Sequence, residues 1–171
     1  MLSLRPVFPP TSRTPRRAMA CWLFKSEPDV FSIDDLKARG SQGEVWDGVR
    51  NYQARNMLRD QVKVGDRIFI YHSNCDVPGV AGIATAMETG VVDPTQFNPD
   101  SEYHDPTSDP ASPRWITVRV RHNETLPATI SLTAIKAHPG LADMQLVKKG
   151  NRLSILPVTD EQWALIMALG A

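Results

Sequence analysis

Residues 45–52 read Val-Trp-Asp-Gly-Val-Arg-Asn-Tyr and bring an aromatic pair, two opposite charges and an amide together. Gly48 marks a point where the backbone turns or is closely approached, and Asn51 is a good N-cap for a helix over 52–58. Arg50 and Asn51 then stand at a helix N-terminus, where free N–H groups favour a polar or negative ligand atom. The stretch predicts a binding loop. The alternative is that its aromatic rings belong to the core and its arginine is a surface charge.

Length and composition predict one domain. The chain has 171 residues and 42% hydrophobic content, enough for a core but too short to suggest two domains. No apolar run approaches the roughly 18 residues of a membrane span, which predicts a soluble protein with no membrane partner. Two cysteines, Cys21 and Cys75, lack a CxxC spacing, so we expect a reducing, cytoplasmic location and no disulfide framework.

Charge is uneven along the chain. Lys plus Arg equals Asp plus Glu at 19 each, but four arginines and no acid fall in residues 1–20, which leaves 15 basic against 19 acidic residues in 21–171. A body of net −4 cannot bind nucleic acid mainly by neutralising phosphates, so base contacts must contribute much of any affinity. The proline- and arginine-rich residues 1–18 predict a disordered tail or a mis-called start, with a transit peptide as the other reading.

Apolar patterns and turn signals predict about six short strands with helices between them. The predicted strands include 21–25, 67–73, 79–87, 115–121 and 153–158, and the predicted helices are 33–38, 52–58, 132–138, 141–148 and a terminal helix from a capping box at 159–162 through 169. Residues 90–114 contain five prolines and five acids, too long and polar for a passive connection, and their aromatic residues predict an ordered flap. Together these elements predict an α+β domain with a mixed, barrel-like sheet.

Five stretches of the chain together resemble the EVE domain family. They are Trp22 to Pro28, Trp46 to Asn56, Phe69 to Ser73, Asp93 to Phe97 with Ser101 to Pro106, and Arg152 to Val158. The resemblance implies a PUA-like pseudo-β-barrel of about six strands with flanking short helices over residues 20–171. It leaves residues 1–18 outside the pattern, and Asn151 stands where the family pattern has Ser.

The opening of the chain also resembles the YTH domains, which read methylated adenine in RNA. The shared features are Leu23-Phe24-Lys25-Ser26, a short helix, and Val45-Trp46. This resemblance implies that Lys25, Ser26 and Trp46 lie at a modified-base pocket.

Aromatic residues dominate the predicted site. Five of the chain's seven Trp and Tyr residues fall in or beside matched motifs: Trp46, Tyr52, Tyr71, Tyr103 and Trp115. Stacking a base on one ring is worth about 1–3 kcal/mol, comparable with the few kcal/mol that extruding a base from a duplex costs. The polar members of the predicted site are Lys25, Ser26, Glu27, Asp47, Arg50, Asn51, His72, Ser73 and Arg152, of which Ser26, Asn51 and Ser73 would read the base edge.

The function expected from these residues is the binding of a flipped, methylated or otherwise alkylated base in RNA or DNA. We expect a monomer without a cofactor. We also expect no metal site, because the cysteines and histidines have no metal-ligand spacing. The alternative is a Mg²⁺-dependent nuclease that uses Glu27, Asp47 and His72. A Ser-His-Asp hydrolase is disfavoured, because His72 and Ser73 are adjacent on a predicted strand and point to opposite faces.

Overall fold

The computed structural model describes residues 19–171 and has a six-stranded mixed sheet at its centre. The strands are β1 (Cys21–Ser26), β2 (Glu44–Val45), β3 (Arg67–His72), β4 (Gly79–Val92), β5 (Ile116–Ser131) and β6 (Ile155–Val158). Their order is β2-β5-β4-β3-β1-β6; β1 and β3 are parallel and the other pairs are antiparallel. The predicted α+β class and the six strands are confirmed, but the sheet keeps two edges, β2 and β6, and does not close into a barrel.

Within residues 19–171, four short helices flank the sheet, and each is preceded by a side chain that caps its N-terminus. They are α1 (Ile33–Ala38), α2 (Tyr52–Asp60), α3 (Leu132–Ala137) and α4 (Asp160–Leu169), with Ser32, Asn51, Ser131 and Thr159 as N-caps. α1 and α4 carry complete capping boxes. None of the helices in the described part of the chain is long and apolar enough to cross a membrane.

One predicted helix is wrong. Residues 141–148 form no α-helix; two 3₁₀ turns, Pro139–Leu141 and Gln145–Val147, occupy this region. Leu141, Met144 and Leu146 are all buried. In an α-helix the two leucines, five residues apart, would point about 140° away from each other. The broken backbone lets all three side chains reach the core.

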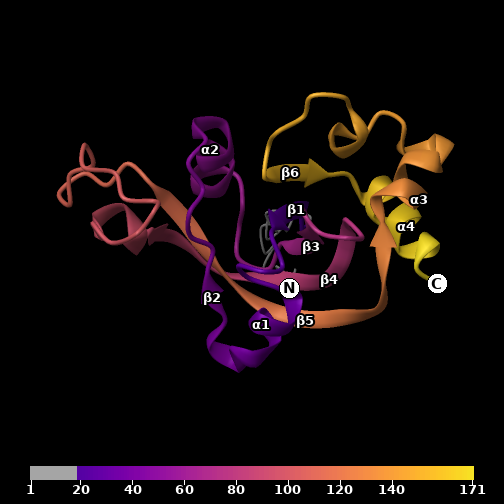
Figure 1. Ribbon diagram of the computed structural model, residues 1–171, viewed down its shortest axis with the longest axis horizontal. Coiled ribbons are helices and arrows are strands. Elements are labelled where there is room, and N and C mark those ends of the chain that lie inside the picture. The colour runs from indigo at the N-terminus through magenta and orange to yellow at the C-terminus, as the bar shows by residue number, and fades with distance from the viewer. Residues whose placement is uncertain (1–18) are drawn as a thin grey trace, which may run out of the picture.

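β4 and β5 are longer than predicted. They extend to Val92 and Ser131, and their pairing passes through several register shifts. Figure 1 shows the two strands running across the molecule, with α3 and α4 at one end and the segment that joins the strands at the other. We call that segment, residues 93–115, the flap.

The middle of the sheet is buried on both faces because β1 and β3 alternate apolar side chains. Trp22 and Phe24 belong to one core cluster, with α1, α2 and the loop at residues 45–52. Leu23 belongs to the other cluster, in which Phe69 stacks on Trp163 of α4 with ring centroids 3.7 Å apart. The predicted tail, residues 1–18, lies outside the described residues.

Buried amide contacts order the flap, as predicted. Gln96 is fully buried, and its side-chain nitrogen donates to the carbonyls of Asp93 and Trp115 at 2.7 and 2.9 Å. The indole N–H of Trp115 donates to Asp105 at 2.8 Å. Hydrogen bonds to the Thr107 side chain and to Trp115 lower the pKa of Asp105 to about 2. The flap is therefore a folded part of the domain.

Candidate functional site

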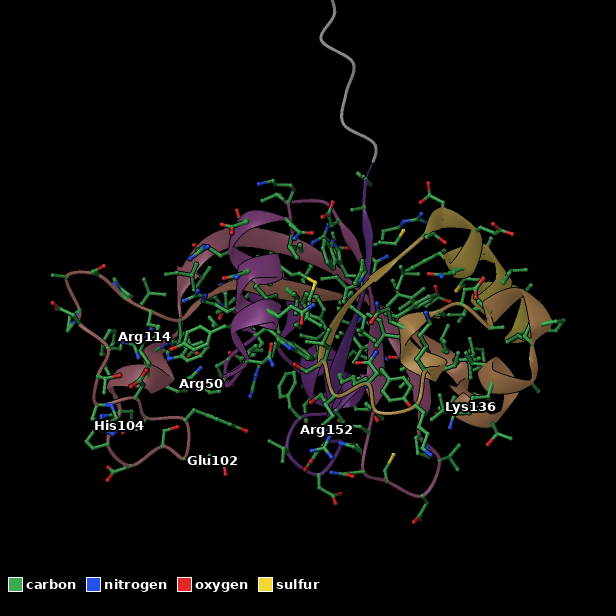
Figure 2. All side chains as sticks on the ribbon, turned by 90° about the horizontal axis from the view of Figure 1, so that it is seen from above. Arg50, Glu102, His104, Arg114, Lys136 and Arg152 are labelled. Carbon is green, nitrogen blue, oxygen red and sulfur yellow. The ribbon has the colours of Figure 1, made fainter. Side chains whose placement is uncertain are left out.

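A cavity of about 890 Å³ opens where the end of β1, the loop at residues 45–52, the flap and the segment before β6 meet. We call it the Trp46 pocket. Nine of the predicted site residues line it: Lys25, Ser26, Glu27, Trp46, Asp47, Arg50, Ser73, Tyr103 and Arg152. Figure 2 shows two lining residues that come from opposite sides, Glu102 from the flap and Arg152 from the segment before β6. A second hollow of about 630 Å³, near Cys21 and Asp160, contains none of the predicted residues.

Trp46 forms a rigid wall of this pocket. Its ring is 6% exposed and packs against Phe24 and Phe31, with centroids 5.4 and 6.2 Å away. Its backbone is fixed to β5 on both sides: the N–H donates to the Val118 carbonyl at 2.9 Å, and the carbonyl accepts from the Thr117 hydroxyl at 2.5 Å. Because backbone and ring are both held, Trp46 has a defined position in the lining of the pocket.

Tyr103 reaches the pocket because Gly48 leaves space for it. Gly48 has φ +80°, and a Cβ placed there would lie 2.8 Å from the Tyr103 ring. The Gly48 N–H donates to the Asp93 carboxylate at 2.9 Å, which fixes the turn. Burial raises the pKa of the Tyr103 hydroxyl most, and a hydrogen bond to Glu102 raises it further. The glycine expected to allow close approach therefore allows a flap residue to lie against the loop.

Arg50 joins the loop to the flap. Its guanidinium donates to Asp93 at 2.9 Å, to the Thr95 hydroxyl at 2.9 Å and to the Tyr103 carbonyl at 2.7 and 3.0 Å. The Asp93 side chain is only 2% exposed. Burial opposes ionisation of Asp93, but hydrogen bonds from Thr95, Arg50 and Gly48 outweigh it, and the pKa of Asp93 is lowered. The donors of Arg50 are thus already used within the protein, although one edge of the side chain faces the pocket.

Charges of both signs line the Trp46 pocket. Burial lowers the pKa of Lys25, whose ammonium lies 5.8 Å from the centre of the Tyr71 ring. The pKa of Asp47 is raised, first by partial burial and then by the nearby charges of Asp93 and Glu44. Cationic and carboxylate side chains therefore both belong to the lining of the pocket.

Five predicted residues do not line the pocket, for reasons that the contacts make plain. Asn51 accepts from the Ala54 N–H as the cap of α2. Tyr52 stacks on Trp115 of the flap, with ring centroids 5.0 Å apart. Tyr71 is 3% exposed in the opposite core cluster, where burial raises its pKa to about 12. His72 accepts from the Ile33 N–H at 3.1 Å and so holds the start of α1.

Several lining residues were absent from the predicted site: Phe31, Arg39, Glu44, Glu102 and Ser154. Phe31 follows the turn after β1, and the Ser26 hydroxyl donates to its carbonyl at 2.6 Å. Arg39 pairs with Glu44 at 2.7 Å across the pocket edge. Glu102 had a signal in the sequence, because it directly precedes Tyr103 in a matched motif.

The predicted nuclease residues are not gathered at one point. Glu27 and Asp47 line the pocket, whereas His72 does not and has its ring nitrogen engaged by α1. Among residues 19–171, no group of three or more His, Cys, Asp or Glu side chains is placed to hold a metal ion.

Comparisons with known proteins bear on the family and the fold of this chain. The EVE domain model matches residues 20–169. Thymocyte nuclear protein 1 of Homo sapiens is 40% identical over 165 residues, which cover 86% of this chain and 72% of that protein. A protein from Pseudomonas putida with a crystal structure is 49% identical in sequence to this chain, and the two structures match with a TM-score of 0.84. The match covers 89% of this chain and 100% of the Pseudomonas chain. The human THYN1 protein in complex with 5-methylcytosine-containing DNA is 39% identical with a TM-score of 0.82, and covers 88% of this chain and 97% of its own.

Proposed function

The chain belongs to the EVE domain family, and from this we propose that it binds DNA and recognises 5-methylcytosine in the Trp46 pocket. The observation that carries the proposal is the pocket itself, a cavity of about 890 Å³ with a fixed indole on one wall and polar groups around it. Ligand sites typically span about 300–1,000 Å³. The DNA-bound human relative favours DNA over RNA among the polymers that the sequence left open.

A flipped base is the form of the ligand that fits such a pocket. A base inside a duplex cannot reach a recessed wall, so the nucleotide must rotate out of the stack at a cost of a few kcal/mol. Stacking on one aromatic ring stabilises the bound base by about 1–3 kcal/mol. Trp46 supplies one such ring, and Tyr103 comes from the flap side of the same cavity.

Lys25 and Arg152 are the cations best placed for the phosphates beside the base. Both line the pocket, and neither forms an ion pair with a carboxylate in the part of the chain that the structure describes. With a net charge of −4 over residues 21–171, few phosphate contacts are expected, and affinity depends on the base.

Trp46→Leu tests the proposal, with Trp163→Leu as a matched control. Both rings are 6% exposed, but Trp163 packs on Phe69 in the opposite core cluster. Fluorescence anisotropy with matched oligonucleotides should show that the wild type prefers 5-methylcytosine to cytosine by tens to about two hundredfold, the range that one methyl group in an apolar slot gives.

Trp46→Leu should lose at least about tenfold in affinity for the modified strand, whereas Trp163→Leu should lose stability only. Equal binding losses in the two variants, or an unchanged preference in Trp46→Leu, would place recognition elsewhere. Cleavage of the labelled strand in Mg²⁺ would instead favour the nuclease alternative.

A further inference from the structure

Asp47 differs from the other acids of the Trp46 pocket because no side chain among residues 19–171 is paired with its carboxylate, which is exposed and has a hydrogen bond only with its own backbone. Glu27 accepts from the Asn74 amide at 2.7 Å, and Glu44 is paired with Arg39. Glu102 is hydrogen-bonded to Tyr103. Within residues 19–171, no side chain donates a hydrogen bond to the Asp47 carboxylate or forms an ion pair with it, although Asp47 follows Trp46 directly and lines the same cavity.

The backbone around Asp47 is nevertheless fixed. Trp46 is tied to β5 through both its N–H and its carbonyl. The N–H of Asp47 donates to the Val45 carbonyl at 3.0 Å, and the N–H of Gly48 donates to Asp93 at 2.9 Å. An acceptor held in this way needs little reorganisation when a ligand arrives, which lowers the entropic cost of binding.

The local electric potential favours a donor in the ligand. Partial burial raises the pKa of Asp47 most, the charges of Asp93 and Glu44 raise it further, and the charge of Arg50 lowers it. The hydrogen bonds of Arg50 go to the flap. A hydrogen-bond donor placed here gains from this negative potential, whereas a carbonyl oxygen is repelled by it.

Resting on the proposed function, we propose that Asp47 accepts a hydrogen bond from the exocyclic 4-amino group of the flipped base. It thereby selects 5-methylcytosine over thymine. The two bases have the same ring size and the same 5-methyl group, so stacking on Trp46 and methyl contacts cannot separate them. They differ at position 4, where cytosine presents an N–H donor and thymine a carbonyl acceptor, and at position 3, where the cytosine nitrogen accepts and the thymine N–H donates. If the Asp47 carboxylate faces the thymine carbonyl, no proton lies between the two oxygens, and neither acceptor is satisfied.

Single-stranded oligonucleotides that differ only in one central base test this, because they remove differences in base-pairing cost. The probes carry 5-methylcytosine, thymine, or 5-methyl-2-pyrimidinone, which has hydrogen in place of the 4-amino group. The wild type should bind 5-methylcytosine about 5- to 150-fold more tightly than thymine, the range of one good base contact. The pyrimidinone should fall between them, because it loses the donor without adding an acceptor.

Asp47→Asn should reduce the preference over thymine to within about threefold, because an amide both donates and accepts. Glu88→Gln is the control: it removes a carboxylate that pairs with Arg119 and does not line the pocket, and it should keep the preference. A wild type that binds 5-methylcytosine but does not discriminate against thymine, or an Asp47→Asn variant that still does, overturns the role of Asp47 alone. A wild type that shows no preference for 5-methylcytosine over cytosine overturns the proposed function instead.

Discussion

Replacing Arg50 with lysine should loosen the flap while leaving the charge in place. The guanidinium makes four hydrogen bonds to flap atoms and one to the Val49 carbonyl. An ammonium has only three donors on one atom and cannot span Asp93, Thr95 and Tyr103 together. Arg50→Lys therefore keeps one of these contacts and leaves the others to water or unsatisfied.

The expected cost follows from the bonds lost. A hydrogen bond to a charged group is worth about 1.5–3 kcal/mol, so losing two of them destabilises the fold by about 3–6 kcal/mol. For a chain of this size each kcal/mol lowers the melting temperature by roughly 2–4 °C, which predicts a decrease of roughly 6–24 °C. Asp93 contributes most, because its side chain is 2% exposed and water reaches it poorly.

Arg59→Lys is the matched control. Arg59 also pairs with an aspartate at 2.8 Å, but its side chain and that of Asp60 are 43% and 52% exposed. Such surface pairs contribute about 0–1 kcal/mol. Urea unfolding followed by tryptophan fluorescence gives the free energies, and hydrogen exchange reports on residues 93–115. A cost below about 1 kcal/mol for Arg50→Lys, with unchanged exchange in the flap, would show that the buried amide contacts alone hold it.

Two further predictions concern the backbone and pH. Gly48→Ala should destabilise the protein and weaken DNA binding more than Gly150→Ala, since both have φ near +80° but only a Cβ at Gly48 meets the Tyr103 ring; thermal melts and anisotropy compare the two. Burial lowers the pKa of His72 below its ordinary 6.5, and the neutral ring accepts from the Ile33 N–H. The unfolded chain therefore binds the proton more readily, and stability present above about pH 6.5 falls as pH decreases; this dependence should flatten in His72→Gln, as measured by denaturant unfolding at several pH values.

Local signals in the sequence predicted local structure well. Asn51 and Thr159 each lie at the start of the helix that they were expected to begin. Each cap requires only a side-chain oxygen and a backbone N–H two or three residues later. A stretch of four residues is therefore enough to predict where the helix begins. The sheet depends on contacts between segments that are distant in the sequence. Its PUA-like arrangement was predicted from the resemblance to the EVE domain and not from local patterns.

The side on which a ring faces was harder to predict. Tyr71 and Trp46 both belong to matched motifs, but Tyr71 alternates with Ile70 along β3 and faces the opposite core cluster. Alternation within a strand shows that Tyr71 and Phe69 share a face. It does not show which face meets the loop at residues 45–52, because that depends on how β5 and α1 pack against the sheet.

The roles of the two charges in that loop follow from energies that no local pattern contains. The sequence placed Arg50 at a helix N-terminus, ready for an anionic ligand. In the structure, releasing Arg50 to a ligand would leave the carboxylate of Asp93 buried without its cation, and breaking a buried pair costs about 3–5 kcal/mol. An exposed ion pair with a phosphate stabilises the complex by less than this cost. Arg50 therefore stays with the flap. Under the function proposed above, phosphate contacts would fall to Lys25 and Arg152, and Asp47, which no side chain among residues 19–171 pairs, would be the loop charge that meets the base.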